Sequence, residues 1–294
     1  GPRWVLGRPL AQALNHPRPT MERFVMNKLM PIFMVILSQA IASLAVADAP
    51  QAGIENHWFM MVTTKSTDPA REAEFNEWYD KIDIPDVLEV PGYMRARRGL
   101  GQRVPAFPQA DLQDDEGRYV ALYDIETGNM DKTIIDMLMA SRRMEERGRS
   151  TSLLKVVERV YYRQYAPAYE APNPKPPGKD SKSYLYLVRV TCCSDEVTEK
   201  RFDDWYDSTY LPAIMETDGF MRATRYELYR VLMTEPKEVP PFLAVYEIEA
   251  ESAEQALRDL DKVVSKLRNT GRMSDLYVEG GATMYLKIND VHRN

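Results

Sequence analysis

The sequence predicts a mixed α+β fold in which two tandem ferredoxin-like βαββαβ repeats pack sheet to sheet within one chain. Three observations predict it: a motif occurs twice, the predicted elements follow the same order around each occurrence, and the predicted strands are apolar on both faces. The motif FNEWYD at residues 75–80 recurs as FDDWYD at residues 202–207, an offset of 127 residues.

Other positions repeat with the motif. Pro85 and Gly92 correspond to Pro212 and Gly219 at the same offset. Because identical residues recur in one order, the sequence indicates an internal duplication, with repeats at 53–166 and 183–290. Residues 167–182 are rich in proline, which fixes φ and removes backbone donors, so a semi-rigid linker is expected there.

Each repeat is expected to contain four strands and two helices. Runs of β-branched and aromatic residues predict strands at 58–64, 93–98, 119–126 and 157–165, and at 184–191, 220–228, 242–249 and 282–288. Apolar residues spaced by three and four predict helices at 68–82 and 130–147, and at 195–209 and 252–268. The helices of one repeat cover only one face of its sheet.

The uncovered face of each sheet is apolar as well, as the consecutive residues 58–62 (WFMMV) show. Pressing the two uncovered faces together removes this surface from water, which stabilises by roughly 25 cal/mol per Å² of apolar area. The duplicated chain therefore supplies its own partner, and we expect a small enclosed chamber between the halves.

The first 47 residues are not expected to be part of the fold, and residues 21–47 are expected to be a targeting segment. Residues 1–20 precede any methionine and are set aside as upstream or added sequence. Residues 21–47 contain Lys28, an apolar stretch and an Ala45-Val46-Ala47 cleavage signal, which together predict a signal peptide. A retained membrane anchor is the alternative. Cleavage predicts a soluble protein, periplasmic in a Gram-negative cell, with no stable membrane association.

Charge and cysteine content exclude several classes of partner and fold. The formal net charge is −6, and no run of Lys and Arg is present to neutralise phosphate, so nucleic-acid and anionic-membrane partners are not expected. Cys192 and Cys193 are adjacent. Neighbouring side chains on a strand point to opposite faces, so no disulfide is expected between them.

One segment resembles a known family. Residues 77–88 (EWYDKIDIPDVL) and 90–93 (VPGY) are similar to the W-Y-x-x-H-I-P-D-x-L-x-x-P-G-F pattern of EthD-like members of the dimeric α/β-barrel superfamily. The second copy keeps Trp205, Tyr206, Pro212 and Gly219 but has Asp218 where the pattern has proline. Covering residues 55–290, the resemblance implies an intrachain dimeric α/β barrel. It does not select an activity, because the superfamily includes isomerases, cyclases, lyases, monooxygenases and haem enzymes.

The departure from that pattern suggests catalytic residues. Where the family usually has histidine, this chain has Asp83 in the first copy and Tyr210 in the second. A carboxylate and a phenol can serve as general base and acid when their surroundings adjust their pKa values. Tyr123 and Tyr246 on the third strands, and the unrepeated His57, are further catalytic candidates; structural roles are the alternative for each.

The remaining candidates would bind substrate. Arg95 and Arg222 occupy equivalent strand positions and could hold a carboxylate or oxyanion, or instead form ion pairs with Asp80 and Asp207. The other candidate binding residues are Tyr79, Tyr206 and Trp58. No metal-binding spacing is present, so neither a metal nor another cofactor is expected.

These residues predict a pocket for a small hydrophobic, aromatic compound. The first hypothesis is a cofactor-independent lyase or isomerase that uses acid/base chemistry. Its alternatives are a periplasmic binding protein without chemistry and a cofactor-free oxygenase. Association of two chains as a homodimer is left open, because the internal pairing already covers both sheets.

Overall fold

A computed structural model describes residues 53–113, 117–174, 178–234 and 238–293. The predicted signal peptide and the residues before it lie outside these ranges. Within them, no helix combines the length and apolar character needed to span a membrane.

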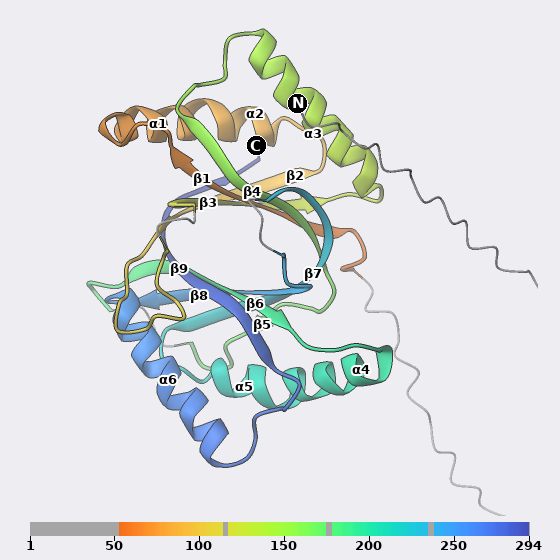
Figure 1. The fold of residues 1–294 in the computed structure, drawn as a ribbon, viewed down its shortest axis with the longest axis vertical. Coiled ribbons are helices and arrows are strands. Elements are labelled where there is room, and N and C mark those ends of the chain that lie inside the picture. The colour runs from red at the N-terminus through yellow and green to blue at the C-terminus, as the bar shows by residue number, and fades with distance from the viewer. Residues whose placement is uncertain (1–52, 114–116, 175–177, 235–237, 294) are drawn as a thin grey trace, which may run out of the picture. The chain divides into compact units, whose positions relative to one another are not determined.

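The described residues form a closed antiparallel barrel (Figure 1). Its eight strands are β1 (His57–Ser66), β2 (Tyr93–Gly101), β3 (Tyr119–Glu126), β4 (Leu154–Gln164), β6 (Lys182–Thr191), β7 (Phe220–Thr234), β8 (Phe242–Ala250) and β9 (Val278–His292). Their order is β4-β1-β3-β2-β9-β6-β8-β7, and β4 pairs with β7 to close the ring. A short extra strand, β5 (Tyr169–Glu170), lies in the predicted linker and pairs with β7.

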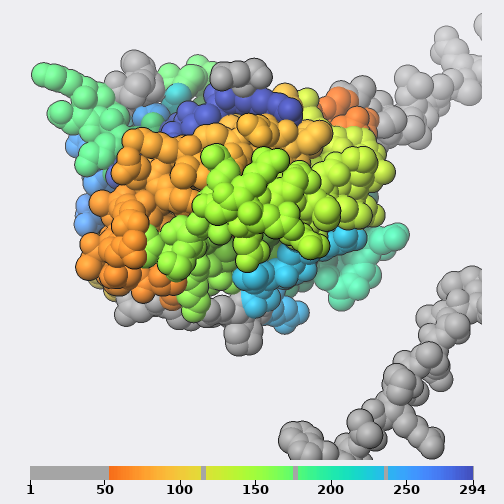
Figure 2. Space-filling view, turned by 90° about the horizontal axis from the view of Figure 1, so that it is seen from above, coloured from red at the N-terminus to blue at the C-terminus, as the bar shows by residue number. Residues whose placement is uncertain are grey.

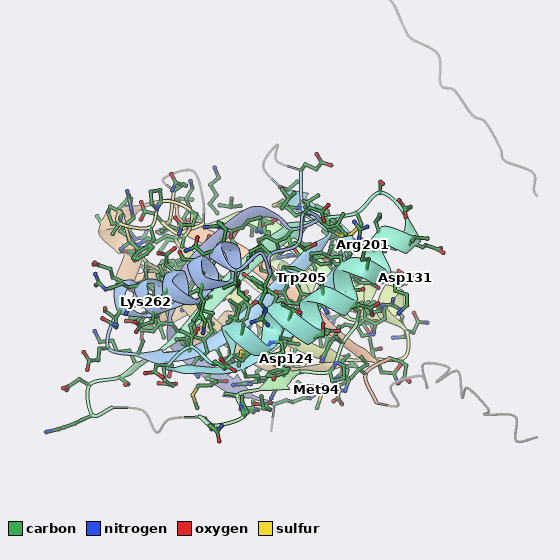
Figure 3. The ribbon with its side chains drawn as sticks, turned by 90° about the horizontal axis from the view of Figure 1, so that it is seen from below. Met94, Asp124, Asp131, Arg201, Trp205 and Lys262 are labelled. Carbon is green, nitrogen blue, oxygen red and sulfur yellow. A yellow bond between two sulfur atoms is a disulfide. The ribbon has the colours of Figure 1, made fainter. Side chains whose placement is uncertain are left out.

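The helices lie outside the barrel, one set on each half. The first half carries η1 (Pro69–Arg71), α1 (Glu72–Trp78), η2 (Tyr79–Asp83), α2 (Ile84–Leu88) and α3 (Met130–Glu146); the second carries α4 (Glu196–Trp205), η3 (Tyr206–Tyr210), α5 (Leu211–Ile214) and α6 (Ala253–Asn269). In Figure 2, α3 lies beside the α1–α2 segment, and Figure 3 looks onto the opposite layer, where α4 carries Trp205 and α6 carries Lys262. The mixed α+β barrel is as predicted.

The two halves are joined more closely than by sheet stacking. Strand β2 hydrogen-bonds to β9 and β4 to β7, so both sheets continue into each other at their edges. Apolar side chains fill the middle of the barrel, among them Phe59, Met61, Leu122, Tyr162, Leu185, Tyr226, Val245 and Tyr285. The prediction of an enclosed chamber at the centre of the barrel is therefore wrong. Cavities lie instead at the barrel ends and between a sheet and its helices.

A π-helical turn interrupts the first helix of each half. The N–H of Ile84 donates to the carbonyl of Tyr79, and the N–H of Leu211 to that of Tyr206, five residues back in both cases. The sequence predicted helix ends at 82 and 209, but helix resumes because Pro85 and Pro212 occupy first-turn positions, where the missing proline N–H costs little.

In each half, one buried arginine connects the helical layer to the sheet. Arg98 donates to Asp80 (2.7 Å) and Asn76 (2.8 Å), and its guanidinium lies 4.3 Å from the ring centre of Tyr79. Arg225 repeats this arrangement in the second half. It donates to Asp207 and Asp203 and lies 4.2 Å from the ring centre of Tyr206.

The sequence assigned these ion pairs to Arg95 and Arg222, which is wrong. Positions 95 and 98 are three residues apart, so they point to opposite faces of the strand. Arg98 faces the helices that carry Asp80, whereas Arg95 pairs with Asp290 and Arg222 with Glu170.

Cys192 and Cys193 form a disulfide, so the expectation of no bond between them is also wrong. Both cysteines follow Thr191, the last residue of β6, and precede α4. Because they lie in a loop, the alternation of side chains along a strand does not separate them.

Replacing Asp80 by alanine should lower the free energy of unfolding by about 2 kcal/mol, because the buried Arg98 loses a charged hydrogen-bond partner. Urea unfolding measures this loss. The matched control is Glu77→Ala in the exposed Glu77–Lys81 pair, which should cost about 0.3 kcal/mol. Equal losses in the two variants would contradict the structural role of Arg98.

Candidate active site

The candidate active site is a cavity of about 480 Å³ in the second half. It lies between the sheet and helices α5 and α6. Its walls include Val188, Ile214, Leu257, Leu260, Val264 and Met273. Four tyrosines also line it: Tyr186, Tyr210, Tyr246 and Tyr277. Apolar walls with a few convergent hydroxyls are typical of a small-molecule pocket.

The polar groups of the cavity form a short relay. The hydroxyl of Tyr210 donates to that of Tyr277 at 3.5 Å, and Tyr277 donates to Oε2 of Glu279 at 3.4 Å. Behind them, the hydroxyl oxygens of Tyr206 and Tyr246 lie 2.7 Å apart. The relay connects the buried wall of the cavity to a carboxylate that lines it.

Local structure explains this convergence. The π turn η3 begins at Tyr206 and ends at Tyr210, so both rings reach the sheet, and their ring centres are 5.0 Å apart. Tyr246 projects from the middle of β8 toward the helices. Tyr277 immediately precedes β9, and Glu279 is the second residue of that strand.

Burial sets the protonation of these groups. Loss of water raises the pKa values of Tyr210, Tyr246 and Tyr277, so their hydroxyls stay protonated and can donate hydrogen bonds. Loss of water also raises the pKa of Glu279, against the opposing effect of the Tyr277 hydrogen bond and the Arg268 charge. The cavity thus combines neutral donors with a carboxylate that accepts a proton more readily than usual.

The first half carries the predicted base Asp83 in a packed setting. Tyr123 donates to Oδ2 of Asp83 at 3.3 Å, and burial raises the pKa of Asp83 to about 6, opposed chiefly by the charge of Arg159. Tyr93 and Tyr161 are fully buried nearby, with hydroxyl oxygens 3.2 Å apart. Asp83, Tyr123 and the buried Tyr79 therefore form a polar cluster inside a core.

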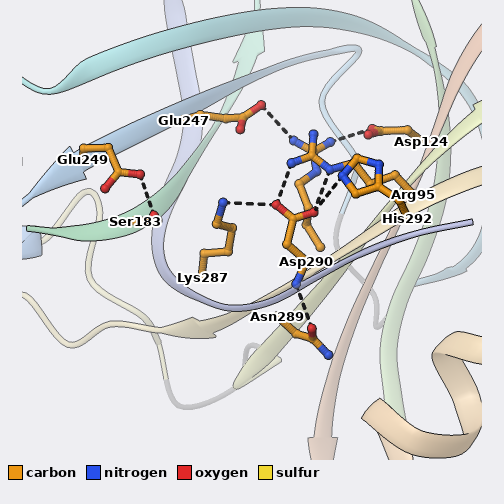
Figure 4. Close-up of polar contacts among 10 residues, drawn as sticks. Arg95, Asp124, Ser183, Glu247, Glu249, Lys287, Asn289, Asp290 and His292 are labelled. Carbon is orange, nitrogen blue, oxygen red and sulfur yellow. Dashed lines mark hydrogen bonds and ion pairs between the residues drawn. The ribbon is translucent and has the colours of Figure 1, made fainter. Parts of the chain in front are cut away.

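Four other predicted residues meet at one end of the barrel. His57, Trp58, Arg95 and Arg222 line a cavity of about 350 Å³ there. Each has a partner. Arg95 forms a two-point ion pair with Asp290 (2.7 and 2.6 Å; Figure 4), and Arg222 lies 3.2 Å from Glu170. His57 lies 3.3 Å from Glu126, and Trp58 donates to the carbonyl of Thr127. The structure thus divides the predicted site residues among three places.

Sequence reasoning missed several cavity residues. Tyr277 and Glu279 have no counterpart in the motif, so the repeat gave no signal for them. Tyr186 lies on a predicted strand, where every second side chain faces the helices, so this alternation could have identified it. Gln109 comes from the first half: residues 102–112 reach across, burying Val104 and Ala110 in the second core, while Gln109 lines the cavity.

Among the described residues, no group of three or more His, Cys, Asp and Glu side chains is placed to hold a metal ion. No histidine of this part of the chain lines the tyrosine-rich cavity.

No family model and no curated protein matches the sequence. Solved structures show limited likeness, and each match covers 81% of this chain. An anthrone oxidase-like protein has 14% identity, a TM-score of 0.46 and 94% of its own length covered. An encapsulated DyP-type peroxidase from Mycobacterium smegmatis has 10% identity and a TM-score of 0.47, with 96% of its own length covered. A proposed monooxygenase from Lactobacillus acidophilus has 8% identity and a TM-score of 0.42, with 97% of its own length covered.

At these scores the likeness assigns no activity to this chain. It does correct the lyase or isomerase hypothesis, because the similar proteins are described as oxidase-like, monooxygenase and peroxidase instead. The oxygenase alternative agrees better with these descriptions.

Asp83→Asn should remove a pH-dependent loss of stability. A carboxyl whose pKa is about 6 in the folded chain but ordinary in the unfolded chain holds its proton more tightly when folded. Its stabilising contribution is complete below about pH 4 and is lost as the pH rises through 6, on the order of 2 kcal/mol. Urea midpoints from pH 4 to 8 should show this fall in the parent and a smaller one in Asp83→Asn. The exposed Glu145→Gln control should match the parent.

Proposed function

We propose that the protein is a cofactor-free oxygenase that acts on an aromatic compound with an acidic C–H group. The relay from Tyr210 through Tyr277 to Glu279, on the wall of a largely apolar cavity, is the observation that carries this proposal. Such a substrate needs only a base and a stabilised anion before it can react with dissolved O₂.

The first step is removal of a proton from the substrate carbon by the Glu279 carboxylate. Glu279 is solvent-exposed, but partial loss of hydration raises its pKa and makes it a stronger base than a freely hydrated glutamate. The remaining electron pair delocalises over the aromatic system onto an oxygen atom. The hydroxyls of the buried Tyr246 and the half-buried Tyr277, which line the cavity, supply hydrogen bonds to that oxyanion.

The second step uses O₂ as the oxidant. The carbanion transfers its electrons to O₂, and a C–O bond forms to give a hydroperoxide after the proton returns from Glu279. Loss of a second C–H proton with cleavage of the O–O bond then releases water and leaves a carbonyl. A CH₂ group and one O₂ become a C=O group and one H₂O, so atoms and electrons balance.

Anthrone is a suitable probe, because its CH₂ group is acidified by two rings and a conjugated carbonyl. The protein should accelerate O₂ consumption and anthraquinone formation above the protein-free rate, with one ¹⁸O atom from ¹⁸O₂ in the product. Glu279→Gln should reduce this acceleration by about 100-fold, a typical value for a lost general base. The rising limb of the pH–rate profile should disappear in the same variant.

The exposed Glu251→Gln variant serves as the control and should keep the parent rate. Thermal midpoints of all variants show whether they remain folded. Absence of accelerated O₂ consumption with anthrone and with hydroxylated analogues, or an unchanged rate in Glu279→Gln, would contradict the proposal.

We also propose that the two halves arose by tandem duplication of an EthD-like unit and that the chain is exported to the periplasm. The recurrence of the π turn and of the buried arginine supports the first point. The second rests on the signal-like sequence before Asp48. Amino-terminal sequencing of the protein from its native host should begin at Asp48; a start farther upstream would contradict cleavage there.

A further inference from the structure

The two halves differ in how their first strand connects to the helix that follows it. In the first half a single residue, Thr67, joins the end of β1 to Asp68, which caps the next helical turn. In the second half three residues, 192–194, join the end of β6 to the capping residue Asp195. The second connection is therefore longer by two residues, three against one, and it contains the disulfide.

The shorter connection is held by hydrogen bonds to the segment before the last strand of its half. The N–H of Thr67 donates to the carbonyl of Leu153 (2.8 Å), and its hydroxyl donates to the carbonyl of Ser152 (3.0 Å). Leu153 immediately precedes β4, as Tyr277 immediately precedes β9. Among the described residues, no hydrogen bond joins either cysteine to the segment before β9. The second half thus has a covalent constraint where the first half has hydrogen bonds.

The disulfide adjoins the segment that carries the proposed relay. Thr191, the last residue of β6, pairs with Val278. Continuing this antiparallel register by one residue brings Cys192 to the level of Tyr277, and both pack against the same core cluster. Val278 in turn lies between Tyr277 and Glu279, the two relay residues of this segment. A change in the cysteine loop therefore acts first on the part of β9 that positions the relay.

The bond is open to a reductant and adds little to global stability. Cys192 and Cys193 are half-buried, and exposed residues flank them on both sides. Because the two cysteines are adjacent in sequence, the bond closes no loop of intervening chain. Disulfides stabilise a fold mainly by restricting the unfolded chain, and this effect increases with the length of the closed loop. The bond is therefore better suited to a local role than to holding the whole fold together.

We propose that the Cys192–Cys193 pair is a redox site at which a dithiol controls the relay between Tyr277 and Glu279. One thiolate of the dithiol attacks a protein sulfur, forming a mixed disulfide and releasing the other cysteine as a thiolate, which takes up a proton. The second thiol of the reductant then displaces the remaining cysteine. The dithiol becomes a disulfide, and the protein gains two electrons and two protons. Reduction frees the longer connection, loosens the start of β9 and lowers the activity of the site; this last effect rests on the proposed function.

Hydrogen–deuterium exchange of the full chain, read by mass spectrometry of its peptides, tests the redox site with dithiothreitol as the dithiol. Alkylation with iodoacetamide shows whether both cysteines have been reduced. Reduction should accelerate exchange of the backbone amides at 277–280 by about tenfold, because the start of the strand opens more often. The equivalent amides at 153–156 are the internal control and should not change, since the hydrogen bonds of Thr67 hold that segment.

The double variant Cys192→Ser, Cys193→Ser should exchange at 277–280 as the reduced parent does, and dithiothreitol should not change it further. Its rate with anthrone should be about tenfold below that of the oxidised parent, because small displacements of catalytic groups are costly. The exchange comparison needs only the two redox states of the parent, so it does not depend on the folding of the variant.

The proposal is overturned if exchange at 277–280 is the same in both redox states, or if the bond of the folded protein resists dithiothreitol. It is also overturned if the folded serine variant oxidises anthrone as fast as the oxidised parent. Accelerated exchange in a protein that oxidises no anthrone in either state supports the redox site and contradicts the proposed function alone.

Discussion

Every barrel strand is covered on both faces, and this requirement determines the architecture. One face of each sheet packs under helices, and the other faces the barrel interior. Burial of apolar area on both sides favours closure over an open sheet. The edge pairings of β2 with β9 and β4 with β7 then satisfy the backbone groups that an open edge would expose. With apolar side chains packed in the barrel interior, the cavities described above lie at the barrel ends and beneath the helices.

The two halves share one scaffold but differ where their helices meet the sheet. Each half has a π turn, a proline after it and an arginine that lies over a tyrosine ring. In the first half Tyr93 and Tyr161 fill the space beside Asp83, whereas Phe220 and Met284 stand at the corresponding positions of the second. A few substitutions therefore separate a packed core from a cavity on the same framework.

The sequence predicted much of the fold because its signals are local or periodic. Apolar residues that alternate with a period of two predicted the strands at 119–126 and 242–249. Apolar residues spaced by three and four predicted the long outer helices. The site was harder to predict. Tyr210 and Tyr246 were found through the repeat, but Glu279 reaches the cavity only through the pairing of β9 with β6. The ion pairs were assigned to Arg95 rather than Arg98 because spacing alone did not show which strand face met the helix.

The crossing of residues 102–112 from the first half onto the second has an evolutionary consequence. Val104 and Ala110 complete a core that belongs otherwise to the second half, and Gln109 supplies part of its cavity wall. A fragment of the protein containing only residues 183–293 would lack the part of the cavity wall that Gln109 supplies. Insertions or deletions in this segment can therefore reshape the cavity without altering any residue of the half that holds its four tyrosines.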